Sequence, residues 1–271
     1  TTTGEISSKA EFQYKKDSSA PTGEISVLEN KWTSFLNTVT FGLFFKESKE
    51  VEITSSGTSV SGSSIEYQLS ETVYTDVESA LAGTWTTYTG KIKINSTRKC
   101  YVYAKITNGA GKATVINSEG LVIYTDSEKE TERIEFIKTA SQDVSASVKL
   151  NGNTVGSVLN GDKELTKGTD YTVSGSVITF KASYLNTLQG GEYTINVHYN
   201  PAGVEYDKNT GKGDAPGVTS ITLQVKKAEQ QPLEISDLQD SYTYGDQEVA
   251  LKTTGGSVTG TVSYSVSYAD G

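Results

Sequence analysis

The side chains that could carry out acid–base chemistry are few, and they do not form a catalytic pattern. His198 is the only histidine, and it lies in a run that alternates Ile195, Val197 and Tyr199 with polar residues. In a strand, this alternation places His198 on the solvent face, opposite the apolar side chains. The sequence contains no Gly-x-Ser-x-Gly motif, which marks the nucleophile of one large class of hydrolases, and no local pair of carboxylates stands out. We therefore predict a chain that is not an enzyme.

One segment has the oxygen-bearing side chains that a calcium ion prefers. Residues 207–214 read Asp-Lys-Asn-Thr-Gly-Lys-Gly-Asp, and the candidate ligands are Asp207, Asn209 and Asp214. The segment lacks a third acidic ligand, and Val218 stands where an EF-hand loop has its bidentate glutamate. We interpret the segment as a flexible hairpin loop without a cofactor, with weak calcium binding as the minor alternative.

Aromatic side chains are the main indication of a binding surface. The chain has 16 tyrosines, and tyrosine serves both sheet packing and recognition because it is stiff and amphipathic. The dense cluster between Trp32 and Phe45 predicts core, and Trp85 is expected to fill a sandwich. Tyr74, just before a predicted helical turn, and Tyr206, on a long loop, are expected to be exposed and are the two candidate binding residues.

The elements that position these residues are short strands. Turn-forming residues recur about every ten positions between runs that alternate apolar and polar side chains, which is typical of β-sandwiches and not of parallel α/β sheets. The sequence therefore predicts an all-β, elongated chain of tandem immunoglobulin-like sandwiches. Asn151-Gly152 predicts a type I′ hairpin turn, because both central residues need positive φ. The clearest strand runs are residues 51–54, 64–69, 91–94, 193–199 and 221–225, and single helical turns are expected at 76–81 and 182–188.

Polar and charged stretches divide the 271 residues into units, and the charged run at 126–132 predicts a solvated linker between two of them. We predict sandwiches at residues 17–126 and 127–227. Residues 1–16 are expected to be a linker or the tail of a preceding unit, and residues 228–271 a partial third β module. The chain has no methionine, so we expect a monomeric fragment of a larger protein.

The charge of the chain excludes two classes of partner. The formal net charge is −9, and an acidic protein repels nucleic acid and anionic lipid, so we expect neither nucleic-acid binding nor membrane insertion. No apolar run reaches the length of a membrane-spanning helix.

Cys100 is the only cysteine, which rules out an internal disulfide, and its strand-like alternation predicts a buried thiol.

Several motifs of the first unit are distinctive. Residues 20–25 read Ala-Pro-Thr-Gly-Glu-Ile, residues 40–46 read Thr-Phe-Gly-Leu-Phe-Phe-Lys, and residues 101–108 read Tyr-Val-Tyr-Ala-Lys-Ile-Thr-Asn. Over residues 17–125 the chain resembles the Ig-like repeats of large surface proteins in gut Clostridia and Lachnospiraceae. That family usually has Asp-x-Ala-Gly-Asn where this chain has Asn-Gly-Ala-Gly-Lys at 108–112.

The second unit has motifs of a different kind. Residues 168–175 read Gly-Thr-Asp-Tyr-Thr-Val-Ser-Gly, and residues 190–193 read Gly-Gly-Glu-Tyr. Over residues 131–226 the chain resembles the Ig-like X-type module found beside catalytic domains in bacterial cellulases and cellulosome scaffolds. This resemblance implies a non-catalytic module, with carbohydrate or cell-wall binding attributed to some members.

Both resemblances imply an extracellular protein, secreted or anchored to the cell wall. The leading hypothesis is adhesion through a host macromolecule, either a polysaccharide or mucin glycan or a host protein such as immunoglobulin, which a sheet edge could bind by strand addition. One alternative is a structural spacer or stalk without a ligand. The other alternative is a carbohydrate-binding accessory module of a glycan-degrading enzyme.

Overall fold

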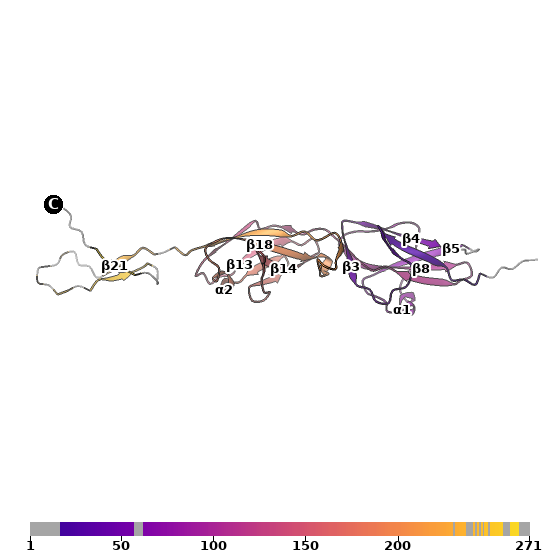
Figure 1. Ribbon diagram of the computed structural model, residues 1–271, viewed down its shortest axis with the longest axis horizontal. Coiled ribbons are helices and arrows are strands. Elements are labelled where there is room, and N and C mark those ends of the chain that lie inside the picture. The colour runs from indigo at the N-terminus through magenta and orange to yellow at the C-terminus, as the bar shows by residue number, and fades with distance from the viewer. Residues whose placement is uncertain are drawn as a thin grey trace, which may run out of the picture.

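Two β-sandwiches follow each other along the long axis of the molecule, with a small hairpin beyond the second (Figure 1). The computed structural model describes residues 17–56, 62–229 and 231–236 and part of 241–265. Each sandwich has its own hydrophobic core, the first between Ile25 and Ile123 and the second between Ile134 and Val225. The predicted all-β, elongated architecture of tandem immunoglobulin-like sandwiches is confirmed.

The first unit is built from two sheets that enclose the first core. Its elements are β1 (Thr22–Val27), β2 (Asn30–Trp32), β3 (Phe41–Lys46), β4 (Lys49–Ser56), β5 (Ser63–Ser70), α1 (Val77–Leu81), β6 (Thr86–Thr87), β7 (Ile92–Ile94), β8 (Arg98–Asn108), β9 (Ala113–Asn117) and β10 (Gly120–Tyr124). One sheet has the order β2-β1-β4-β7, and the other contains β3-β10-β8-β5-β6 with β9 also paired to β8. Cys100 lies on the core face of β8 and is fully buried, as its alternation predicts.

The outer face of β8 is covered as well. Tyr101 and Tyr103 point away from the main core, yet both are buried in a second cluster against the short helix α1. Asp76 caps this helix by accepting a hydrogen bond from the Ser79 amide at 2.7 Å, so the predicted helical turn is confirmed. Trp85 packs half-buried on this outer cluster, so its predicted place inside the sandwich is wrong.

The second unit also has two sheets around one core. Its elements are β11 (Glu128–Lys129), β12 (Arg133–Ile137), β13 (Val144–Lys149), β14 (Thr154–Asn160), β15 (Lys163–Glu164), β16 (Tyr171–Ser174), β17 (Val177–Phe180), α2 (Ala182–Leu185), β18 (Gly191–Asn200), the 3₁₀ turn η1 (Pro201–Gly203), β19 (Lys212–Gly213) and β20 (Thr219–Lys226). The sheets have the orders β11-β13-β17-β16 and β12-β20-β18-β14-β15. Strand β19 is the exception, because it pairs with β3 of the first unit.

The turn at Asn151-Gly152 has the expected backbone but a different role. Both residues have positive φ, 51° and 85°, and the Asn153 amide donates to the Leu150 carbonyl at 2.9 Å. The turn nevertheless joins β13 to β14, which belong to different sheets. The predicted hairpin is therefore wrong, because turn residues determine local dihedral angles and not the strand with which each arm pairs.

The ends of the chain are described only in part. Residues 1–16 lie outside the described residues. In the predicted partial module at 228–271, β21 (Glu234–Ser236) pairs antiparallel with β22 (Lys252–Thr254). Within the described part of the chain, no helix is long and apolar enough to cross a membrane.

Candidate functional site

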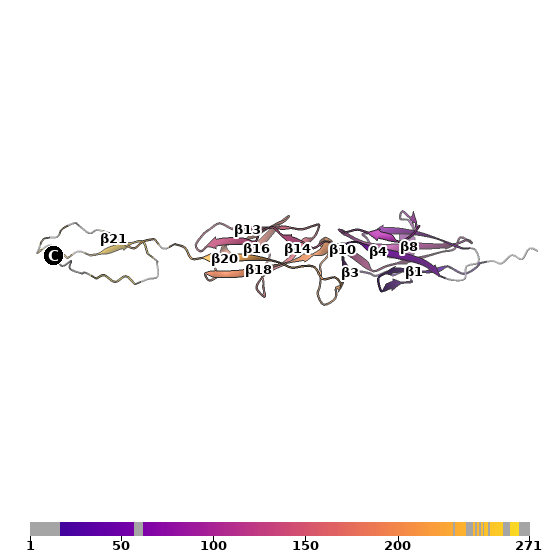
Figure 2. The same ribbon diagram turned by 90° about the horizontal axis from the view of Figure 1, so that it is seen from above.

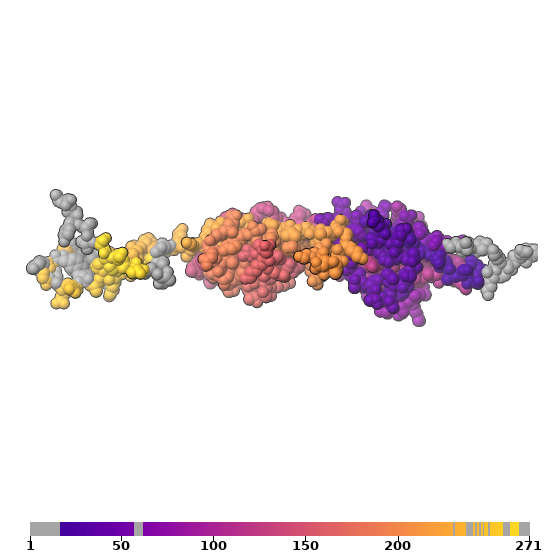
Figure 3. Space-filling view, in the orientation of Figure 1, coloured from indigo at the N-terminus to yellow at the C-terminus, as the bar shows by residue number. Residues whose placement is uncertain are grey.

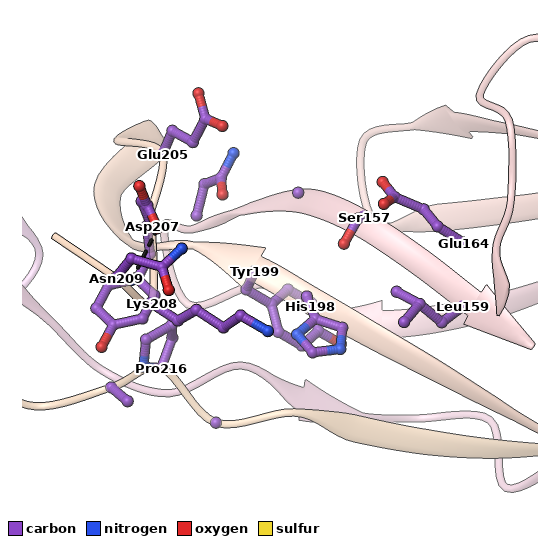
Figure 4. A pocket seen from close by; sticks show the side chains of 15 residues that line it. Ser157, Leu159, Glu164, His198, Tyr199, Glu205, Asp207, Lys208, Asn209 and Pro216 are labelled. Carbon is purple, nitrogen blue, oxygen red and sulfur yellow. Dashed lines mark hydrogen bonds between the residues drawn. The ribbon is translucent and has the colours of Figure 1, made fainter. Parts of the chain in front are cut away.

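A groove of about 610 Å³ lies on the outer face of the five-stranded sheet of the second unit (Figure 4). Strands β14 and β18 form its floor. Its wall is the segment 204–217, which connects η1 to β20 and which we call the arm. The groove therefore lies between the sheet and the arm.

The floor of the groove is shaped by a β-bulge. Val155 pairs with Tyr199 and Ser157 pairs with His198, so Gly156 is the extra residue. A Cβ atom at Gly156 would lie 2.6 Å from the Oδ1 atom of Asn200. Glycine at this position therefore lets the Asn200 amide lie against the neighbouring strand.

His198 is the central side chain of the floor. It is exposed on β18 between the buried Val197 and Tyr199, as the alternation predicts. Within the described residues, its imidazole makes no hydrogen bond or ion pair inside the protein. Lys208 extends from the arm toward this imidazole (Figure 4). The groove therefore presents both side chains to solvent.

The arm is held in shape next to the groove by Asp207. One carboxylate oxygen of Asp207 accepts the Asn209 amide at 2.8 Å, and its carbonyl accepts the Gly211 amide at 2.7 Å. The hydrogen bond from the Asn209 backbone lowers the pKa of the Asp207 carboxyl, because it stabilises the ionised form. The turn at 207–211 therefore orients the side chains of Lys208 and Asn209.

The chemistry of the lining suits a ligand that is rich in hydroxyl groups. The ammonium group of the lining donates hydrogen bonds and its carboxylates accept them, while its imidazole, amide and hydroxyl groups can do both. An open groove gives an extended molecule access to these donors and acceptors. The polar lining side chains are Ser157, Glu164, His198, Asn200, Glu205, Asp207, Lys208 and Asn209, with the ring of Tyr206 beside them.

Three of the five predicted site residues, Tyr206, Asp207 and Asn209, line this groove. Tyr206 was expected to be exposed, but it is half-buried, because its ring packs edge to face on Phe44 of the first unit, with centroids 4.9 Å apart. Asp214 lies outside the groove, where one of its carboxylate oxygens accepts the Lys46 amide at 2.8 Å.

Tyr74 lies in the first unit, away from the other predicted residues. It is half-buried, with its ring 5.0 Å from that of Tyr103 and its amide donating to the Tyr103 hydroxyl at 2.9 Å. The predicted exposure of Tyr74 is thus wrong, since the outer cluster of the first unit extends over β8. Tyr74 still borders a separate polar hollow of about 420 Å³ with Thr84 and Arg98.

Two of the three predicted calcium ligands, Asp207 and Asp214, already have partners within the protein. Asp207 caps its own turn and Asp214 binds the backbone of the first unit. Across the described ranges, no three His, Cys, Asp or Glu side chains are grouped as a metal site would need. Weak calcium binding at 207–214 stays the untested minor alternative.

Sequence reasoning did not single out Ser157, Glu164 or Lys208, and it set His198 aside as a surface residue. The alternation along β14 and β18 indicates which face each side chain takes. It does not indicate that the arm folds back beside that face, so the grouping of these residues carries no sequence signal.

Comparison with known proteins matches the second unit to one family. Residues 130–211 match the family model described as carbohydrate binding domain X2. Over 67 residues, 24% of this chain and 4% of the relative, the sequence is 46% identical to cellulose-binding protein A of Clostridium cellulovorans. Over 89 residues, 31% of this chain and 16% of the relative, it is 37% identical to endoglucanase B of Paenibacillus lautus. The matched part is thus a small fraction of each relative.

Among solved structures, a tri-modular endo-β-1,4-glucanase from Bacillus halodurans matches with a TM-score of 0.30 and 17% identity, covering 42% of this chain and 20% of that chain. The family match shows that the second unit is similar to an X-type module, and the names of the curated relatives are those of cellulose-binding and glucan-degrading proteins. The resemblance of the first unit to gut-bacterial surface repeats stays a prediction.

Proposed function

We propose that the second unit is a non-catalytic carbohydrate-binding module that holds a polysaccharide chain in the groove. In this role it would serve an extracellular glycan-degrading protein as an accessory module. The observation that carries the proposal is the match of residues 130–211 to a carbohydrate-binding family. The matched segment includes β14, β18 and the arm as far as Gly211, and so most of the residues that line the groove.

The names of the relatives suggest a class of ligand. They are a cellulose-binding protein, a xyloglucanase and an endoglucanase, so we propose a β-1,4-linked glucan as the ligand. A glucan chain presents hydroxyl groups along both edges. The mixed donors and acceptors of the groove can pair with these groups. Because the groove is open, it can bind an internal segment of a long chain and does not require a chain end.

The outer sheet face beyond the groove is less suited to this role, because its polar groups already pair with each other. Arg133 contacts Glu192 at 3.0 Å and Gln224 at 2.6 Å. Ser220 donates to Asn196 at 2.8 Å. A ligand on that face would have to break these contacts, whereas His198 in the groove is open to a new partner.

The test is affinity electrophoresis of the full chain in gels with soluble xyloglucan or hydroxyethyl cellulose, with a pull-down on insoluble cellulose. We expect retardation of the wild type and weaker retardation of His198→Ala and Lys208→Ala. The matched controls are Thr194→Ala, exposed on the same face of β18, and Lys167→Ala, an exposed lysine remote from the groove. Both controls should behave as wild type.

Two results would count against the proposal. One is the absence of any glucan binding at about 1 mM ligand, a concentration that detects binding free energies near −4 kcal/mol. The other is equal loss of binding in the groove and control variants. Parallel titrations with mucin glycans and immunoglobulin would test the adhesion hypothesis, which stays a prediction.

A second role, that of a spacer, is supported by the segment that joins the two units. The segment 126–132, predicted as a solvated linker, is largely tied to the protein. Ser127 is buried and donates to the Leu150 carbonyl at 2.9 Å, and Glu128 and Lys129 pair with β13. A joint built this way would hold the binding groove at a set distance from whatever precedes the first unit.

A further inference from the structure

The arm of the second unit reaches across to the first unit. Figure 2 shows the loop between β18 and β20 extending to the end of β3 and β10, and in Figure 3 the orange arm lies against the indigo surface of the first unit. The same segment is the wall of the groove. The arm therefore both contacts the first unit and forms the wall of the groove.

The contact begins with strand addition. In β19, Lys212 and Gly213 pair parallel with Leu43 and Phe44, at the edge of β3 that β10 leaves open. The Asp214 amide then donates to the Phe44 carbonyl at 2.8 Å. An open edge strand has unpaired amide and carbonyl groups, so the arm completes the sheet of the first unit.

Three further features hold the tip of the arm to the first unit. The Lys46 amide donates to the Asp214 carboxylate at 2.8 Å, and the Tyr124 hydroxyl donates to the Asp214 carbonyl at 2.7 Å. Gly213 has a φ of 92°, and a Cβ atom there would collide with the Phe44 carbonyl oxygen. The approach is therefore as close as only glycine permits.

An apolar cluster lies under these hydrogen bonds. Phe44, Val122 and Tyr124 of the first unit are buried, and Val204 and Tyr206 of the arm pack against them. At its two roots the arm is tied by the Asn153 side chain, which accepts the Ala202 amide at 3.1 Å, and by Asp126, which accepts the Gly217 amide at 2.8 Å. The arm is thus fixed along its length.

We propose that the first unit positions the wall of the groove in the second unit. The edge of β3, with Phe44 and Lys46, orders the arm, and the ordered arm places Lys208 and Asn209 opposite His198. An arm without this support would have to lose conformational freedom when a ligand binds, and ordering in advance removes that cost from binding. That the groove binds glycan rests on the function proposed above.

The test compares two glycine variants of the full chain. Gly213→Ala removes the close approach to Phe44, and Gly168→Ala is the matched control, because its φ of 89° is nearly the same and a Cβ atom there meets only open space. Asp214→Ala is a second variant that removes the hydrogen bond to the Lys46 amide. The ligand-free readouts are hydrogen exchange of the Lys46 and Asp214 amides and the imidazole resonance of His198, the only histidine.

We expect Gly213→Ala and Asp214→Ala to speed exchange at the junction amides whose acceptor groups are still present, to move the His198 resonance and to weaken xyloglucan binding about tenfold. Gly168→Ala should change none of these. The proposal is overturned if the junction amides exchange freely while the His198 resonance stays in place, or if exchange itself does not change in either variant. If the wild-type protein binds no glucan, the function proposed above is wrong. The two ligand-free readouts would still decide whether the first unit positions the wall of the groove.

Discussion

The rings of Phe44 and Tyr206 pack edge to face with their centroids 4.9 Å apart and their planes at 80°, although Phe44 belongs to the first unit and Tyr206 to the second. Such a pair contributes about 0.5–1.5 kcal/mol beyond the apolar area that it buries. Phe44 is almost fully buried, and Tyr206 is the part of the arm that covers it. The two sandwiches therefore share a small core.

Truncating Tyr206 should destabilise this shared core. We expect Tyr206→Ala to lower the free energy of unfolding by about 2 kcal/mol, from the lost ring contact and the lost apolar burial. Tyr206→Phe should keep most of the stability, because the ring makes the contact. Guanidinium denaturation followed by circular dichroism measures both, and equal losses in the two variants would contradict an edge-to-face contact as the source.

The Cys100 thiol should be inert in the native protein. It is fully buried on the core face of β8, and burial raises its pKa to about 11, since the thiolate would lie in an apolar environment. We expect no reaction with Ellman's reagent at pH 8 in the folded state. One equivalent should react in guanidinium, and rapid native labelling would show that β8 opens far more readily than its packing indicates.

Alkaline pH should weaken the junction through Tyr124. Burial, followed by the charges of Asp126 and Asp214, raises the pKa of its phenol above the ordinary value of 10.0. A raised pKa favours the neutral phenol in the folded state, so its contribution is present below pH 10 and is lost as the pH rises above that value. Thermal melts between pH 7 and pH 11 should record this loss.

The matched variant for that measurement is Tyr124→Phe, which lacks the hydrogen bond to the Asp214 carbonyl. At pH 7 it should be less stable than wild type by about 1 kcal/mol. Above pH 10 the difference should shrink, because only the wild type has a phenol at this position to ionise on unfolding. A difference that stays constant across this range would show that Tyr124 does not titrate on unfolding.

Removing calcium should leave the stability unchanged. The carboxylates of Asp207 and Asp214 accept backbone amides at 2.8 Å, so each already has a partner. A site occupied at ten times its dissociation constant would add about 1.4 kcal/mol to the free energy of unfolding. Melts in EDTA and in millimolar calcium should therefore coincide, and a clear rise with calcium that Asp207→Asn abolishes would establish the minor alternative.

Much of the fold follows from local patterns that can be read in the sequence. Alternation of period two determines which face each side chain of a strand takes, and it correctly places Cys100 inside and His198 outside. Turn residues determine local backbone angles, as the positive φ values at Asn151 and Gly152 show. These signals act over a few residues, which is why a single sequence is enough to predict them.

The partners of each element were decided only by the tertiary structure. Nothing near Asn151 indicates that the two flanking strands enter different sheets, and nothing near Tyr206 indicates that its ring meets Phe44 of another unit. The prediction of a flexible hairpin loop at 207–214 is wrong, because this part of the arm contains β19, which pairs with β3 of the first unit. That pairing depends on an open strand edge and an apolar surface far away in the sequence. Alternation and turn residues in the sequence determined two β-sandwiches, whereas the groove exists because long-range packing of the arm brings Lys208 and His198 into the lining of one pocket.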